Sequence, residues 1–452
     1  MNTAWLTYSE QLSIELLQSR DEGKDVSGYE KEVEEVLKLQ GAEREKKAAA
    51  LLDELAALPV QEGHPYREPS DLEGIRWESG ERLARRKVEL SDEALYDKIL
   101  GAWLGRCAGC LLGQPIEGWK RARILGLLKD TGNYPIRYYI SSDVPAEIRE
   151  RYDIRDEAWV YGSSKKSWIN NVEHMVEDDD TNYTIIALSL LERFGLDFTP
   201  ENVAETWLMN LPILHVCTAE RVAYKNLVNL VLPPDSAVYR NAYREWIGAQ
   251  IRGDFFGYIT PGNPALGAEM AWRDASISHV KNGIYGEMWV AAMLSAAAVV
   301  DDMEDIIRIG LAEIPQRSRL AEALRDLLTW KKKGMDWEDA LDEIHRRYDE
   351  NNGHDWCHTI SNAGIVAAAL LYGEKDFEKS ISMAVMAAFD TDCNGATVGS
   401  VLGMVLGAKN LPDKWIAPLN NLIKSGVDGF QLVKISELAE RTLPFAKMTM
   451  ER

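Results

Sequence analysis

Two short acidic stretches that lie far apart in the chain carry the residue types best suited to chemistry. They are Glu177–Thr181 (EDDDT) and Asp390–Asn394 (DTDCN). Neighbouring carboxylates repel one another unless positive charge lies among them, and hard divalent cations prefer carboxylate and hydroxyl oxygens as ligands. We therefore expect both stretches to hold a pair of Mg²⁺ or Mn²⁺ ions, which can bind a vicinal diol, orient a water molecule and lower its pKa. The expected ligands are the five aspartates Asp178, Asp179, Asp180, Asp390 and Asp392.

Acidic stretches of this kind can also arise without a metal ion. Acidic residues stabilise the N-terminus of a helix, where the helix dipole favours negative charge. The Asp390 stretch begins like a calcium-binding EF-hand loop, but the twelfth position is Val401 instead of the required glutamate. An aspartyl nucleophile would need a strand before Asp390, whereas residues 381–389 have a helical pattern.

Two further pairs have metal-ligand spacing but weaker support. Cys107 and Cys110 form a CxxC motif without a second such pair, inside a glycine-rich apolar run. His354 and His358 have the spacing of zinc ligands on a helix, without a glutamate between them. The chain contains no phosphate-binding GxxxxGK[ST] or GxGxxG motif and no HExxH or GxSxG motif.

Glycine repeats predict the elements that position the acidic stretches. Glycine recurs every fourth residue over 101–113 and again over 395–407. Each glycine costs about 1 kcal/mol relative to alanine in a helix interior, so such a stripe indicates close approach of another backbone. If the two helices pack along their stripes, Glu117, which follows Pro115, and the second acidic stretch should meet at a common centre.

The rest of the chain favours an all-α protein, because helical spacing of apolar residues dominates and strand alternation is scarce. Residues 1–90 are predicted to be an N-terminal helical extension, and 91–452 the catalytic domain. Residues 120–176 are rich in Tyr and Trp and are expected to form an insertion that covers a site. Beyond the acidic stretch, helices are predicted at 185–194, 201–209, 217–231, 236–250, 286–301, 303–312, 318–333, 337–349, 360–372 and 376–388.

Three motifs in this order resemble the ADP-ribosylglycohydrolase family. They are Gly101–Gly118 (GAWLGRCAGCLLGQPIEG), Asp179–Thr181 (DDT) and Asp390–Gly399 (DTDCNGATVG). Residues 251–253, 274–279 and 358–362 also resemble its pattern, so the resemblance covers roughly residues 95–410. It implies an orthogonal bundle of helices with a dinuclear Mg²⁺ or Mn²⁺ centre. It also implies hydrolysis of a bond at the anomeric carbon of ribose, typically to release ADP-ribose from a side chain.

The resemblance assigns roles to individual residues. It places metal ligands at Asp178, Asp179, Asp180, Asp390, Asp392 and Cys393. Asp179 or Asp180 is then the base that activates water, and Glu117 lies beside the ribose as a catalytic and substrate-binding residue. His279 and Asn394 are further candidates for substrate contact, although His279 could be a satisfied buried histidine and Asn394 a helix cap.

Three positions depart from the family pattern. Asp178 replaces a hydroxyl residue, Cys393 replaces a threonine, and Cys110 replaces the aspartate of GDxxG. These differences leave two alternatives to an ADP-ribosyl hydrolase. One is a hydrolase of a small free ribosyl metabolite or nucleoside, and the other is a non-catalytic protein that binds ADP-ribose or metal.

Net charge and cysteine content limit the binding partners and the cellular location that we expect. A net charge of -21 over 452 residues argues against binding to nucleic acid or to anionic membranes. Five cysteines, an odd and sparse set, indicate reduced thiols and a cytoplasmic location. The first residues lack the pattern of a signal peptide, and the longest apolar runs fall short of a membrane span.

Overall fold

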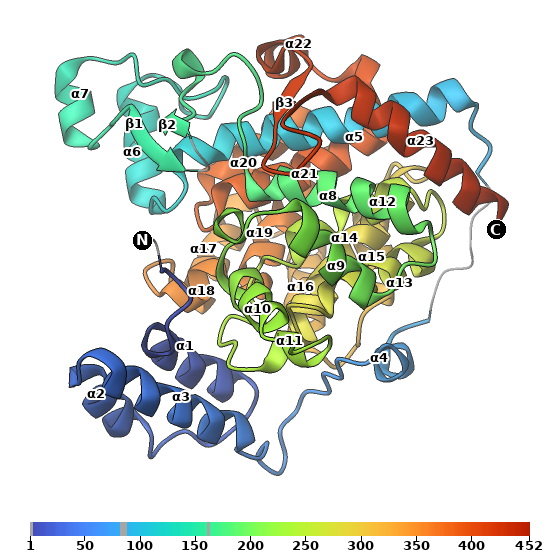
Figure 1. Ribbon diagram of the computed structural model, residues 1–452. Helices are drawn as coiled ribbons and strands as arrows, with labels where there is room; N and C mark the ends of the chain where they lie inside the picture. Colours follow the sequence, from blue (N-terminus) through green and yellow to red (C-terminus); the bar gives the residue numbers. More distant parts are fainter. Residues whose placement is uncertain (1–2, 82–87, 161–162) are drawn as a thin grey trace.

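The computed structural model describes residues 3–81, 88–160 and 163–452. The predicted all-α class is confirmed, since helices make up most of these ranges (Figure 1). Their strands form two short antiparallel pairs, β1 (Glu157–Val160) with β2 (Ser163–Lys165) and β3 (Leu422–Lys424) with β4 (Leu432–Lys434). No helix within the described ranges has both the length and the apolar character needed to cross a lipid bilayer.

The two glycine helices pack against each other, as predicted. Helix α5 (Asp92–Gly113) is capped by Ser91, whose side chain accepts a hydrogen bond from the backbone N–H of Ala94. It lies antiparallel to α21 (Thr391–Leu406), so that a Cβ on Gly101 would clash with the carbonyl oxygen of Gly403. Because the same holds for each glycine along the stripe, only glycine permits this backbone separation.

The other long helices include some that pack directly on this pair, such as α14 (Lys281–Ala297), α20 (Phe377–Met386) and α23 (Ile435–Glu451), and others that lie farther from it. The long helices also include α8 (Asp179–Phe194), α9 (Pro200–Asn210), α10 (Thr218–Val228), α13 (Pro264–Ala275), α15 (Met303–Ala312), α16 (Arg319–Lys332), α17 (Trp337–Arg347) and α19 (Thr359–Tyr372). Shorter ones are α11 (Asp235–Val238), α12 (Asp254–Tyr258), α18 (Gly353–Cys357) and α22 (Asp413–Ile416). Helix α14 is buried on all sides, which explains its apolar composition.

The helix predicted at 236–250 is wrong. Helix α11 ends at Val238, and Arg240 then has a φ of 47° that a right-handed helix excludes. The irregular chain that follows is held by tertiary contacts; for example, the Asn241 side chain donates hydrogen bonds to the carbonyl oxygens of Ala219 and Ser278. The acidic stretches lie at the N-caps and first turns of α8 and α21.

The aromatic insertion contains α6 (Arg121–Asp130), α7 (Ala146–Arg151), β1 and β2. The N-terminal residues form α1 (Tyr8–Asp21), α2 (Glu30–Lys38), α3 (Gly41–Ala57) and α4 (Leu72–Glu78). Helices α1–α3 lie together at one side of the molecule, and α4 lies apart from them (Figure 1). Apolar residues of the first three helices, including Leu12, Leu51 and Leu55, form a small core distinct from the main one.

Candidate metal and active site

The N-termini of α8 and α21 and the segment after α5 converge on one cavity of about 330 Å³. Ligand pockets of folded proteins begin at about this size. Among the lining residues are Gln114, Glu117, Ala158, Ser163, Lys165, Lys166, Ser167, Val176, Glu177, Asp178, Asp179, Cys217, Thr218, Glu220, Ile251, Trp356, Cys357, Asp390, Asp392, Cys393 and Trp5. From the aromatic insertion, the lining includes Ala158, Ser163, Lys165, Lys166 and Ser167.

The first acidic stretch is positioned by the cap of α8. Asp178 is the N-cap residue, and its carboxylate accepts a hydrogen bond from the backbone N–H of Asp180 at 3.0 Å. Gln114, immediately after α5, donates from its side chain to the Asp178 carboxylate at 2.6 Å and to the carbonyl oxygen of Glu177 at 3.1 Å. The end of the glycine helix therefore orients the start of α8.

The second acidic stretch is fixed by contacts on both sides. Ala388 and Phe389 have positive φ values of 65° and 56°, which turn the chain sharply from α20 into α21. The backbone N–H of Asp390 donates to the side-chain oxygen of Asn362 at 3.1 Å. The Thr391 hydroxyl donates to the carbonyl oxygen of Gly113 at 2.9 Å. Such strained backbone is found where a surrounding structure holds it for function.

Three groups of possible ligand atoms lie within 4.8 Å of one another in this centre. They are Glu117 with Asp390 and Asp392, Asp180 with Asp392 and Cys393, and Cys110 with Asp178 and Asp180. One carboxylate oxygen on each of Asp180, Asp390 and Asp392 is buried without a hydrogen-bond partner in the structure. Buried carboxylate oxygens without donors are costly, and divalent cations would satisfy them, so these residues fit the predicted metals.

Electrostatics supports the same conclusion. Burial, and then the charges of Asp178 and Glu117, raise the pKa of Asp179 well above its usual range. Burial raises the pKa of Asp390 to about 6. Glu117 faces the cavity, yet desolvation by the surrounding walls and the charges of Asp390 and Asp178 raise its pKa to about 8. The cluster therefore resists full ionisation unless a cation joins it.

Compensating charge from the protein is limited. Arg106, fully buried in α5, pairs with Asp180 at 3.2 Å and with Asp254 at 2.9 Å. In the described parts of the chain, neither Lys nor Arg forms an ion pair with Asp178, Asp179, Asp390 or Asp392. Arg106 thus holds the first acidic stretch in place while most of the negative charge stays uncompensated.

Several residues at the site were not anticipated from the sequence. Glu220 of α10 lines the cavity, and burial raises its pKa to about 6 although Arg252 donates to it at 3.1 Å. Lys166 lines the cavity and donates to the carbonyl oxygen of Pro115 at 3.1 Å. Of the residues that the sequence analysis missed, only Arg106 and Gln114 could have been recognised from the sequence. They are polar residues within the glycine helix or directly after it.

Two of the candidate substrate contacts, His279 and Asn394, are held by other side chains of the protein. Neither His279 nor Asn394 is among the described residues that line the cavity. His279 is buried beside Ser278, with 2.8 Å between its Nδ1 and the hydroxyl, and burial lowers its pKa well below the usual value. Asn394 donates to Asn362 at 2.8 Å, so it supports the residue that holds Asp390. Asp180 is also absent from the cavity lining, unlike Asp179.

The histidine pair has the wrong hydrogen bonds for zinc. His354 Nδ1 accepts from the indole N–H of Trp246 at 3.0 Å, and His358 Nδ1 accepts from the backbone N–H of Ile360 at 3.1 Å. Both partners can only donate, so in each neutral ring the proton lies on Nε2. His354 uses it to donate to Asp21 at 3.0 Å. The two cysteines of the CxxC motif are buried in α5 without a disulfide.

This chain is similar to several known proteins in sequence or in structure. An uncharacterized protein from Archaeoglobus fulgidus is 24% identical over 335 residues, which cover 72% of this chain and 93% of that protein. A solved structure described as an ADP-ribosylglycohydrolase-related protein complex shares 17% identity at a TM-score of 0.45, covering 79% of this chain and 99% of that one. The family model described as ADP-ribosylglycohydrolase matches residues 91–448, and the chain therefore belongs to the ADP-ribosylglycohydrolase family.

Proposed function

We propose that this protein is a metal-dependent hydrolase that cleaves a glycosidic bond to ribose, with an ADP-ribosyl compound as the substrate. The observation that carries the proposal is the set of buried carboxylate oxygens without hydrogen-bond partners on Asp180, Asp390 and Asp392. They lie beside a cavity, at the ends of helices that the glycine stripes bring together. Family membership supports a glycohydrolase activity at this centre.

The metal ligands in this proposal are Asp178, Asp180, Asp390 and Asp392, which belong to the groups of ligand atoms within 4.8 Å of one another, with Cys393 beside them. Asp179, the remaining candidate ligand, lines the cavity next to them. Bound Mg²⁺ or Mn²⁺ would supply Lewis-acid polarisation and a lower pKa for a water molecule. Asp179 is the better candidate for the base, because its carboxylate lines the cavity whereas Asp180 is held by Arg106. Glu117 orients the ribose or assists proton transfer, since it lines the cavity beside Asp390 and Asp392.

The decisive experiment is a product assay on a panel of ribosylated compounds. Mass spectrometry would follow ADP-ribosylated peptides, nucleosides and other ribosyl metabolites, with Mg²⁺, with Mn²⁺ and with a chelator. We expect turnover only with metal, and a loss of at least about a thousandfold in Asp390→Asn and Asp392→Asn, as for removal of an essential catalytic group. Asp305→Asn, an exposed position in the first turn of α15, removes the same charge and should retain full activity.

The small cavity favours one alternative substrate. A volume of about 330 Å³ is at the lower end of the range for ligand pockets, which suits a free ribosyl metabolite or nucleoside. The same panel distinguishes the two, because the better substrate has the higher kcat/KM. Turnover that survives both aspartate substitutions would contradict the proposed mechanism. Binding that stabilises the protein, with no product after long incubation, would instead indicate a non-catalytic ADP-ribose-binding protein.

The same proposal includes a cytoplasmic location. All five cysteines are thiols in the structure, and reduced thiols are typical of that compartment.

A further inference from the structure

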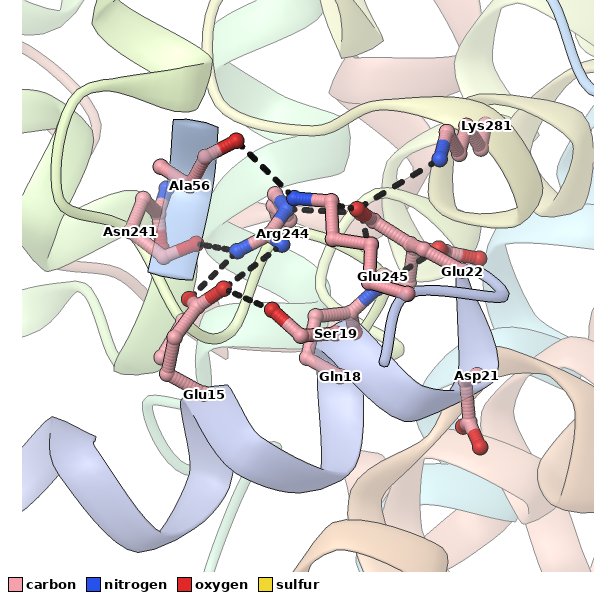
Figure 2. A network of polar contacts seen from close by, with 12 residues as sticks. Glu15, Gln18, Ser19, Asp21, Glu22, Ala56, Asn241, Arg244, Glu245 and Lys281 are labelled. Carbon is pink, nitrogen blue, oxygen red and sulfur yellow. Dashed lines mark hydrogen bonds and ion pairs between the residues drawn. The ribbon is translucent and has the colours of Figure 1, made fainter. Parts of the chain in front are cut away.

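Helix α1 of the N-terminal region is docked on the catalytic part of the chain through buried polar groups (Figure 2). Arg244 donates to Glu15 at 2.6 Å and to Glu22 at 2.9 Å, and all three side chains are buried. Gln18 donates to Glu245 at 2.6 Å. Fully hydrogen-bonded charge pairs of this kind have little freedom to rearrange, so they fix the position of α1.

The residues before α1 continue this contact along α10. Arg221 donates to the carbonyl oxygen of Ala4 at 3.3 Å, and Lys225 donates to that of Leu6 at 2.9 Å. The guanidinium of Arg221 lies 4.6 Å from the ring centroid of Trp5, which is within the range of a cation–π contact. Arg221 is itself buried and also donates to the carbonyl oxygen of Val216 at 2.7 Å. Trp5 is thereby held by a rigid partner.

These contacts place Trp5 in the wall of the cavity that contains the carboxylate cluster. Trp5 has a φ of 62°, a left-handed conformation that is strained for a bulky residue. Thr218, the first residue of α10, lines the same cavity and has a φ of 29°. Backbone strain is retained where the surrounding structure over-determines it, often at ligand sites. Two such residues from distant segments therefore line the same cavity.

We infer that Trp5 is a specificity-determining residue, and that the N-terminal helical region completes the substrate cavity. Its ring offers a flat apolar surface to a planar group of the substrate beyond the ribose, such as a purine base. This inference rests on the proposed function, in which the ribose lies beside Glu117 and the carboxylate cluster. It gives the N-terminal region a role in substrate selection in addition to packing.

The first test compares binding of two probes to the full chain. ADP-ribose carries a purine base, whereas ribose 5-phosphate does not, and both would be titrated by calorimetry in Mn²⁺. We expect Trp5→Ala to weaken ADP-ribose binding about tenfold, the usual effect of losing one stacking contact, and to leave ribose 5-phosphate unchanged. Trp5→Phe should restore most of the loss. Trp77→Ala removes a ring that is 85% exposed and outside this cavity, and should change neither affinity.

An equal loss for both probes in Trp5→Ala, or no loss for either, would overturn the inference. Failure of the wild-type protein to bind either probe would instead count against the proposed function.

A second measurement decides the position of Trp5 without any ligand. Cys217 lines the same cavity, and its labelling by a thiol reagent can be followed by mass spectrometry. Labelling should be severalfold faster in Trp5→Ala and unchanged in Trp77→Ala; an unchanged rate in Trp5→Ala would refute the placement of the ring in the wall.

Discussion

Two regions of this molecule bury acidic side chains, but only one of them pairs most of these side chains with basic residues. Where α1 docks, Glu15 and Glu22 pair with Arg244, and Glu245 pairs with Arg319 at 2.7 Å. At the carboxylate cluster, the ion pair to Asp180 from Arg106 leaves the remaining aspartates without a basic partner in the described ranges. A structural network neutralises its charge internally, whereas the cluster is organised for a cation from outside.

The two regions should therefore respond with opposite signs when a charge is removed. Neutralising a partner in the docking network leaves a buried charge alone and destabilises the protein. Neutralising an aspartate in the cluster relieves repulsion when metal is absent. Free energies of unfolding from denaturant titration, measured with chelator and with Mn²⁺, test this difference directly.

The largest effect is expected for Arg244→Met. This substitution leaves Glu15 buried without its cationic partner, while Glu22 keeps only its contacts with Lys24 at 3.3 Å and Lys281 at 3.5 Å, and it should cost about 3–5 kcal/mol. Arg452→Met is the matched control. Arg452 also forms a bidentate ion pair, with distances of 2.8 and 2.9 Å to Asp197, but this pair lies at the surface. It should cost less than about 1 kcal/mol. Similar losses for both variants would show that the docking network adds no more than a surface pair.

A smaller effect of opposite sign is expected for Asp392→Asn. In chelator, the loss of one repelling carboxylate should stabilise the protein by about 1–3 kcal/mol, the scale of an unsatisfied buried polar group. The stabilisation that Mn²⁺ gives to the wild-type protein should then disappear. Asp305→Asn serves as the control and should behave like wild type in both conditions. A destabilised Asp392→Asn protein in chelator would mean that the cluster is already compensated.

The smallest effect is a pH dependence at the docking network. Burial raises the pKa of Glu22, but Arg244, Lys281 and Lys24 lower it by more, so the net pKa lies below the usual 4.5. A lowered pKa stabilises the folded state above the usual value, and this contribution is lost as pH falls below it. Glu22→Gln should thus cost about 1 kcal/mol at pH 7, and its difference from wild type should shrink below about pH 4.

The matched control for that measurement is Glu93→Gln, which removes an exposed ion pair with Lys409. Its unfolding curve should follow wild type at every pH. A Glu22→Gln difference that stays constant from pH 7 down to pH 3 would show that the carboxylate charge contributes nothing to docking.

Much of the central architecture followed from short segments of sequence. The glycine spacing over 101–113 and 395–407 predicted the α5–α21 pair, because the absence of a side chain at every fourth residue is itself the packing surface. The acidic motifs predicted the cluster, since adjacent carboxylates need a common partner wherever they lie. The same packing of the glycine helices predicted that Glu117 meets the second acidic stretch, and Glu117 lines the cavity together with Asp390 and Asp392.

The helix prediction for 236–250 failed because distant contacts override the local pattern. The 236–250 segment has helical spacing, yet Arg240 has a positive φ, and Asn241 and Arg244 form hydrogen bonds with other elements. His279 lies in a motif of the family but is absent from the cavity lining. Asn394, a candidate for substrate contact or for a helix cap, donates a hydrogen bond to Asn362.

The sequence by itself determined the helical class, the glycine helix pair and the acidic motifs, because each is a property of residues close together in the chain. Tertiary structure alone decided that Arg106 pairs with Asp180, that Glu220 faces the cavity and that Trp5 reaches its wall. These are contacts between side chains separated by many residues. Their geometry depends on how whole elements pack, which no local spacing specifies.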